Sequence, residues 1–172
     1  MFKTAIVAFV LLLAISSLAQ PPSSPLPATV VTHDDIQAFI NALPRNAVSD
    51  KPIRTVDVGG YHVAVYGVFR PQVIKQEANF HETRITEIYY VLSGNATLVT
   101  GGTIPNPHPL LPGSGAMVTM QGARIDGGVT RRVTKGDVIV IPAYTPHWWS
   151  SQDGDLEYLI FRPDPEGKIP LK

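Results

Sequence analysis

Two stretches of this chain decide its fold. The first is NFHETRITEIYYVLSG, residues 79–94, and the second is GDVIVIPAYTPHWWSS, residues 136–151. Both are rich in β-branched and aromatic residues, which are typical of β-strands. Each also carries groups that bind divalent metals, His81 and Glu87 in the first stretch and His147 in the second. We therefore expect the two stretches to meet in a β-structure around a metal site.

Two histidines and one carboxylate form a ligand set with open positions, as in non-haem iron sites and several zinc sites. The chain has no cysteine, which excludes thiolate ligands and disulfides. Iron, manganese, zinc and nickel all accept such a set, so the sequence predicts a divalent metal ion without identifying it. The alternative is a metal-free polar interior in which His81 and His147 hydrogen-bond to Glu87.

The first stretch resembles the first motif of the cupin family, G-x5-H-x-H-x(3,4)-E-x6-G. His81, Glu87 and Gly94 match it. Thr83 stands where the motif has its second histidine, and Lys75 stands where it has its first glycine. The loss of that histidine would leave one metal position to water, to substrate or to nothing, or would abolish the metal site.

The second stretch resembles the second cupin motif, G-x5-P-x-G-x2-H-x3-N. Gly136, Pro142 and His147 match it, whereas Tyr144 and Ser151 replace its other glycine and its asparagine. The resemblance covers roughly residues 55–163. It implies an all-β fold, the cupin jelly-roll β-barrel, here with a short N-terminal helix. It also implies the metal ligands above and a possible homodimer formed through edge strands.

Other side chains near the two motifs are candidates for a substrate pocket: Thr83, Tyr89, Tyr144 and Trp149. Neighbouring residues of a strand face opposite sides, so only one of Trp148 and Trp149 should line the barrel. Aromatic walls with a few polar groups are typical of small-molecule pockets. For each aromatic residue, ordinary core packing is the alternative.

The rest of the chain also has a β-pattern, with glycine and proline between short apolar runs. Such a pattern is typical of an antiparallel sandwich or barrel. A Gly59-Gly60 turn joins the first two expected strands into a hairpin, and residues 93–95 are expected to form another turn. The expected strands are residues 53–58, 61–69, 73–80, 88–92, 96–100, 116–120, 129–134, 138–141 and 156–161.

The N-terminus has the pattern of a signal peptide over residues 1–19. Lys3 is followed by an apolar run over residues 6–15 and by a small-x-small cleavage site that ends at Ala19. The run is shorter than the roughly 20 residues that a membrane-spanning helix needs. We expect an exported protein, periplasmic or secreted, with no stable membrane anchor after cleavage.

The mature chain divides into four expected parts. A Pro-rich linker over residues 20–31 precedes a short helical segment over residues 32–50, in which Thr32 caps the helix. The cupin β-barrel occupies residues 51–163. A polar tail over residues 164–172 is expected to be loose.

Three further features lie between the motifs. Residues 101–115 form a loop rich in glycine and proline, a composition typical of a lid or binding loop at this length. His108 in this loop is expected to be solvated. Of the adjacent Arg131 and Arg132, one is expected to point inward, and a buried arginine needs a carboxylate or an anionic ligand.

The charge balance limits the function classes. Among 172 residues the chain has 14 basic and 14 acidic residues, so no basic surface indicates nucleic-acid binding. The first hypothesis is an enzyme, a metal-dependent oxygenase, isomerase or decarboxylase acting on a small organic molecule. The alternative is a cupin that binds a small molecule without catalysis, either metal-free or with a structural metal. A surface that binds sugars or polymers through exposed aromatic residues is a third hypothesis.

Overall fold

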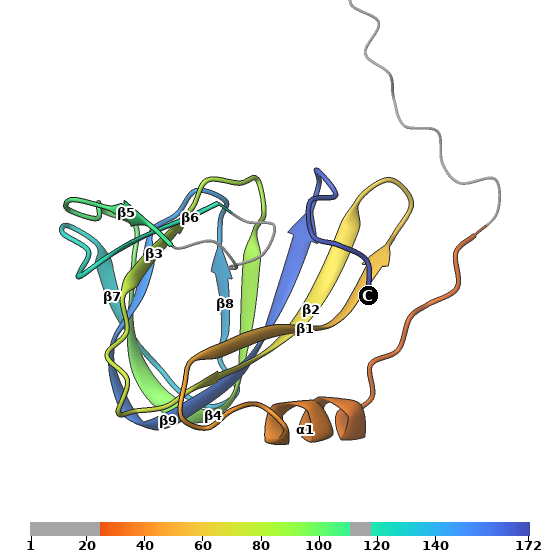
Figure 1. Ribbon diagram of the computed structural model, residues 1–172, viewed down its shortest axis with the longest axis horizontal. Helices are drawn as coiled ribbons and strands as arrows, with labels where there is room; N and C mark the ends of the chain where they lie inside the picture. Colours follow the sequence, from red (N-terminus) through yellow and green to blue (C-terminus); the bar gives the residue numbers. More distant parts are fainter. Residues whose placement is uncertain (1–24, 111–117) are drawn as a thin grey trace, which may run out of the picture.

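The computed structural model describes residues 25–110 and 118–172 (Figure 1). The predicted signal peptide, part of the linker and residues 111–115 of the predicted loop lie outside these ranges. No helix within the described ranges is long and apolar enough to cross a membrane. The elements are α1 (His33–Asn41), β1 (Ser49–Asp57), β2 (His62–Arg70), β3 (Ala78–His81), β4 (Glu87–Thr100), β5 (His108–Pro109), β6 (Thr119–Gly122), β7 (Val129–Val133), β8 (Val138–Ile141) and β9 (His147–Asp164).

The strands form one antiparallel sheet that folds over into two layers. Its main path runs β1-β2-β9-β3-β6-β5, and β4 pairs with β7, β8 and β9. The long strands β4 and β9 pair along most of their length and belong to both layers. The C-terminal half of β9 pairs with β2 and its first residue pairs with β3. The predicted all-β jelly roll is therefore confirmed.

The predicted turn at residues 93–95 is wrong, because β4 runs through it as a single strand. Gly94 has a φ of +86°, and a Cβ placed there would lie 2.3 Å from the backbone oxygen of Asp155. The pairing register of β4 with β9 shifts at this point, so the glycine forms a bulge instead of a turn. β9 likewise begins at His147, nine residues before the predicted strand, because Gly154 continues it.

Alternating side chains of β2 separate the inside of the barrel from the outside. Ala64 and Val68 point into the buried core together with the inner residues of β4 and β9. On the outer side a Cβ at Gly67 would lie 2.8 Å from the Phe39 ring, so this glycine lets α1 pack against the strand. The helix therefore lies outside the barrel and below β1 and β2 in Figure 1.

Helix α1 is shorter than the predicted helical segment. Thr32 caps it as predicted: its side chain accepts from the Asp35 backbone N–H, and the Asp35 carboxylate accepts from the Thr32 backbone N–H. The helix ends at Asn41, and β1 begins at Ser49.

The C-terminal tail is ordered, which contradicts the expectation of a loose segment. The Ile169 N–H donates to Asp164 Oδ2 at 2.6 Å, and both residues are buried. Lys172 exchanges two backbone hydrogen bonds with Thr55 of β1, at 3.1 and 3.2 Å. The tail is therefore held on the barrel by the buried Ile169 side chain, which packs with Ala64 and Ile85, and by backbone hydrogen bonds.

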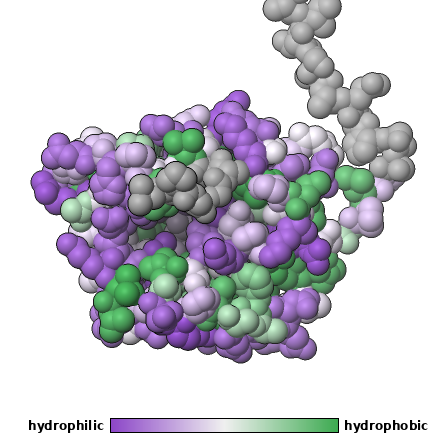
Figure 2. All heavy atoms as spheres, viewed as in Figure 1, coloured by the Kyte–Doolittle hydropathy of each residue, from purple (hydrophilic) through white to green (hydrophobic). Residues whose placement is uncertain are grey.

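The exposed apolar residues do not mark a binding face. On the face that Figure 2 shows, hydrophobic residues gather in separate patches among hydrophilic ones. Val138 and Val140 of β8 are exposed apolar residues, at 63% and 61% exposure. Single exposed apolar residues are normal on soluble proteins and do not by themselves mark a binding face.

Candidate functional site

His81, Glu87 and His147 come together inside the barrel. They are the last residue of β3, the first of β4 and the first of β9. Glu87 Oε2 lies 3.6 Å from His81 Nε2 and 3.3 Å from His147 Nε2. One ligand atom from each residue lies within 4.8 Å of the others, so the three side chains could hold a metal ion. The chain leaves the strand between β3 and β4, which lets His81 and Glu87 converge although both belong to the first motif stretch.

The Nδ1 atoms of both imidazoles, which face away from Glu87, form hydrogen bonds. His147 Nδ1 lies 3.0 Å from the Thr145 carbonyl oxygen, which only accepts, so Nδ1 carries the proton and Nε2 carries a lone pair. His81 Nδ1 lies 2.9 Å from Thr119 Oγ1. Burial lowers the pKa of His147 to about 4, although Glu87 opposes this shift. His147 is therefore neutral at pH 7.

The Glu87 carboxylate is charged although it is only 2% exposed. Arg162 Nε and Nη2 each lie 2.7 Å from Oε1, and Tyr89 Oη donates to Oε2 at 3.0 Å. Burial alone would raise the pKa of Glu87, but Arg162 and His81 hold it well below its usual range. Arg162 also donates to both carboxylate oxygens of Asp50, at 3.2 and 2.8 Å.

These contacts fit a cation. The His147 Nε2 lone pair and the anionic Glu87 Oε2 face each other at 3.3 Å, an arrangement that is repulsive unless a positive charge lies between them. Burial holds the pKa of His147 near 4, which disfavours a proton on this imidazole as that charge at pH 7. A divalent metal needs a deprotonated donor set of this kind, with the second nitrogen of each histidine bonded outward.

Thr83 leaves a donor position open. Its side chain is 2% exposed, and within the described residues its Oγ1 is one of two buried side-chain atoms with no hydrogen-bond partner, the other being Thr55 Oγ1. Glu82 and Arg84 on either side are exposed, as their position between the predicted ligands suggests. The residues present therefore fit a metal with three protein ligands and open coordination positions.

A cavity of about 680 Å³ lies beside the two candidate histidine ligands, His81 and His147. It lies between the layers, and its walls come from the strands β1, β2, β3, β4, β6 and β9 and from the tail. His81, Tyr89 and His147 line it together with the two arginines Arg70 and Arg162. This volume suits a small organic molecule.

Three of the predicted pocket residues do not line this cavity. Thr83 is buried and is not part of the cavity lining. Trp149 packs in the core and donates from Nε1 to Tyr158 Oη at 3.2 Å, whereas Trp148 is half-buried and donates to the Gln76 carbonyl. Tyr144 is 53% exposed, with a left-handed φ of +61° at the position where the cupin motif has glycine.

Arg70 and Arg162 escaped the sequence analysis, although strand alternation could have found both. Arg70 continues the inner face of β2 after Tyr66 and Val68. Arg162 follows Tyr158 and Ile160 on the inner face of β9, beyond the predicted end of that strand. The two inner arginines are therefore on β2 and β9.

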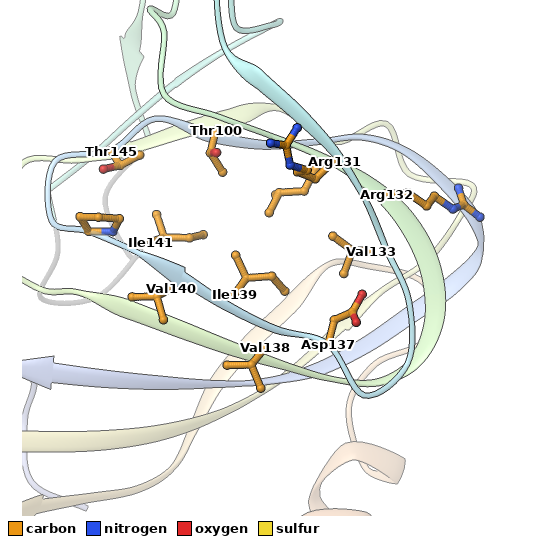
Figure 3. A pocket seen from close by; sticks show the side chains of 12 residues that line it. Thr100, Arg131, Arg132, Val133, Asp137, Val138, Ile139, Val140, Ile141 and Thr145 are labelled. Carbon is orange, nitrogen blue, oxygen red and sulfur yellow. The ribbon is translucent and has the colours of Figure 1, made fainter.

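The prediction that Arg131 or Arg132 points inward is wrong, since both are exposed. They border a second hollow of about 380 Å³ between β7 and β8. In the described chain these two strands pair with β4 and not with each other. Figure 3 shows Ile139 and Ile141 extending into the hollow and Arg132 extending away from it. No imidazole lines this hollow.

A comparison with protein families finds one that matches more than half of the chain. The family model described as Cupin matches residues 77–172, a range that contains all three candidate ligands and Arg162. The chain belongs to the cupin family. A comparison with curated proteins finds no match.

Solved structures match this chain at low identity and with TM-scores below 0.5. A protein from Bacillus halodurans is 17% identical with a TM-score of 0.48, over 84% of this chain and 89% of that one. The DMSP lyase from Ruegeria pomeroyi is 18% identical with a TM-score of 0.42, over 87% and 81%. Procruciferin, the 11S globulin from Brassica napus, is 12% identical with a TM-score of 0.40, over 60% of this cupin and only 21% of the globulin.

Proposed function

We propose that this cupin binds a divalent metal through His81, Glu87 and His147 and acts on a small organic molecule in the adjoining cavity. One observation carries the proposal. The Nε2 atoms of the two histidines and Glu87 Oε2 form a close group beside a cavity between the layers, and each histidine is bonded outward through Nδ1. An oxygenase, an isomerase and a decarboxylase remain the reaction classes that suit this site.

The residues around the ligands have separate roles in this proposal. Arg162 keeps the Glu87 carboxylate charged, and Tyr89 orients it through the hydrogen bond to Oε2. Burial, together with the Glu87 charge, raises the pKa of Tyr89 well above its ordinary value, so Tyr89 acts as a donor and not as a base. A bound metal would supply a Lewis acid and open coordination positions for substrate.

A second candidate function is a cupin that binds a small molecule without catalysis. The observation that favours it is the ion-pair network of Arg162, which neutralises Glu87 without any metal. Thr83 in place of the second motif histidine favours it as well. In this alternative, the cavity holds the ligand and any metal is structural.

A substrate screen separates the two functions. The purified protein is loaded with iron, manganese, zinc or nickel and incubated with small organic acids, hydroxy acids and sugars. Metal-dependent product formation that chelation and His147→Ala both abolish supports the enzyme, with exposed His108→Ala as a matched control that retains activity. Ligand binding without product for any metal supports the second function, and turnover by chelated, metal-free protein contradicts the first.

Export is a further part of the proposal. It is supported by the charge at Lys3, the apolar run over residues 6–15 and the small residues that end at Ala19. N-terminal sequencing of the protein recovered outside the cytoplasm should begin at Gln20. An intact N-terminus starting at Met1 would contradict it.

The last part of the proposed function concerns the oligomeric state, which we propose to be a homodimer. β1 and β5 stand at the two ends of the main strand path, and β1 is the longer of the two. The tail bonds to β1 at Thr55, and strand edges that are not covered in this way favour pairing with a second copy. Light scattering at micromolar concentration should give twice the chain mass, and the mass of a single chain would contradict a dimer.

A further inference from the structure

Two arginines line the cavity, and they differ in what neutralises them. Arg162 lies between two carboxylates, Glu87 and Asp50. Arg70 donates from Nε to Tyr158 Oη at 2.6 Å and from Nη1 to Gln76 Oε1 at 2.5 Å, and both acceptors are neutral. The described residues include every acidic residue of the chain, and Arg70 forms no ion pair with any of them.

The Arg70 guanidinium is held in one orientation. Its side chain follows the inner face of β2, and its two acceptors are themselves fixed. Tyr158 is buried and also accepts from Trp149, and Gln76 donates to the Ile74 carbonyl at 2.6 Å. A guanidinium has five N–H donors, and the described residues accept from only two of them here. The three remaining N–H donors are on Nη1 and Nη2, and Arg70 is one of the residues that line the cavity.

The rest of the lining adds positive charge. Two carboxylates, Asp50 and Glu77, line the cavity. Asp50 is bound to Arg162, and Glu77 is exposed and lies 3.9 Å from His108. The cationic side chains of the lining are Lys51, Arg70, Lys75, Arg162 and Lys172. A partly buried cation that lacks a counter-ion is unfavourable, and an anionic ligand would remove that penalty.

We propose that the cavity binds a small organic acid and that Arg70 binds its carboxylate through the free donors of the guanidinium. A planar carboxylate matches the guanidinium fork with two parallel hydrogen bonds. A phosphate dianion fits less well, since such groups usually use several backbone donors at a helix N-terminus. The one described helix, α1, packs outside the barrel on Gly67. The assignment rests on the proposed function only for the location of the ligand, because Arg70 can bind an anion without a metal.

Calorimetry on the wild-type protein tests whether the cavity binds a carboxylate, without the need for any variant. The probes are butyrate, succinate and benzoate, each paired with its neutral amide, and inorganic phosphate. The measurements are made in chelator and again after metal loading. We expect at least one acid to bind in chelator about tenfold or more tightly than its amide and more tightly than phosphate. Equal binding of acid and amide, preference for phosphate, or no binding of any acid at millimolar concentration overturns the assignment.

Variants then locate the contact. Arg70→Gln should remove the preference for acid over amide, Arg70→Lys should keep only part of it, and Arg132→Gln on the outer surface should leave it unchanged. Binding of acids that requires metal and survives Arg70→Gln would place the carboxylate on the metal and overturn the role of Arg70. That outcome would leave the metal site intact, whereas acid binding at Arg70 by protein that takes up no metal would refute the metal site alone.

Discussion

The cavity beside the candidate metal ligands and the hollow between β7 and β8 are two spaces in the same jelly roll, and they differ in chemistry. The cavity has two imidazoles and two inner arginines in its wall, and the ordered tail borders it. The hollow is lined by aliphatic side chains such as Ile139 and Val133, and its arginines face solvent. The fold supplies both spaces, but only the inward side chains of β2, β3, β4 and β9 make one of them a site.

The largest expected difference between the two regions concerns their arginines. Arg162→Met leaves Glu87 buried without its main counter-charge and should destabilise the chelated protein by about 3–5 kcal/mol in urea unfolding. Arg132→Met removes an exposed pair with Asp153 and should have little effect. Metal loading should restore part of the stability of Arg162→Met, since a bound cation would compensate Glu87. Equal effects of Arg162→Met and Arg132→Met on stability would contradict the difference proposed between the cavity and the hollow.

The second prediction concerns acid sensitivity of the cavity side. Burial depresses the pKa of His147 from 6.5 to about 4, so the unfolded chain binds a proton in this range and the folded chain does not. Stability of the chelated protein should therefore fall as the pH decreases from 6.5 to 4, by roughly 3 kcal/mol from this residue.

His147→Gln provides the control for this prediction. It should flatten the pH dependence between 6.5 and 4.5, because glutamine does not titrate. The pKa of Glu87 is depressed, so this residue stabilises the fold fully above about pH 4.3, and its contribution is lost as the pH falls further. Its effect therefore lies below the range of pH 6.5 to 4.5 in which His147 is tested. An unchanged pH profile in His147→Gln would show that the imidazole is not buried in neutral form.

The third prediction uses the two buried hydroxyls that lack a partner among the described residues, Thr83 and Thr55. Replacing either by valine removes an unsatisfied polar atom and should stabilise the chelated protein by about 1 kcal/mol in urea unfolding. If an open metal position at Thr83 is used, only Thr83→Val should also weaken metal binding. Matched metal affinities in both variants would exclude any contact between Thr83 and the metal.

The smallest expected effect is at Tyr144, in the turn between β8 and β9. Its left-handed φ of +61° is strained for a residue with a Cβ. Tyr144→Gly should therefore be more stable than Tyr144→Ala by about 1 kcal/mol in thermal unfolding, since both lose the ring but only glycine relieves the strain. The reverse order would show that the turn does not require this conformation.

The two motifs were sufficient to predict the fold and the convergence of His81, Glu87 and His147. This prediction came from the resemblance of the two stretches to the cupin motifs, because a local β-pattern does not by itself determine the order of the strands. The ends of the long strands were not predictable in this way, because Gly94 and Gly154 form a turn or a bulge depending on the strand beside them. The predicted last strand ended at residue 161, shortly before Pro163, so Arg162 fell outside it.

The side chains that line the cavity were harder to predict than the presence of a cavity. Tyr144 and Trp149 were expected to line a pocket because they are aromatic and close to a motif, but one is exposed and the other is in the core. Arg70 was overlooked because a single arginine at a strand end has no motif. Its significance depends on which carboxylates lie nearby, and that is a property of the folded chain.

Metal content is the most direct test of the central claim. The purified protein, without an affinity tag that binds metal, is analysed for iron, manganese, zinc and nickel beside the double variant His81→Ala/His147→Ala. We expect about one divalent ion per chain in the wild type and none in the double variant, because the ion needs both imidazoles. Wild-type protein that stays metal-free after each ion has been added would contradict the metal site and leave a cupin that binds its ligand through the arginines.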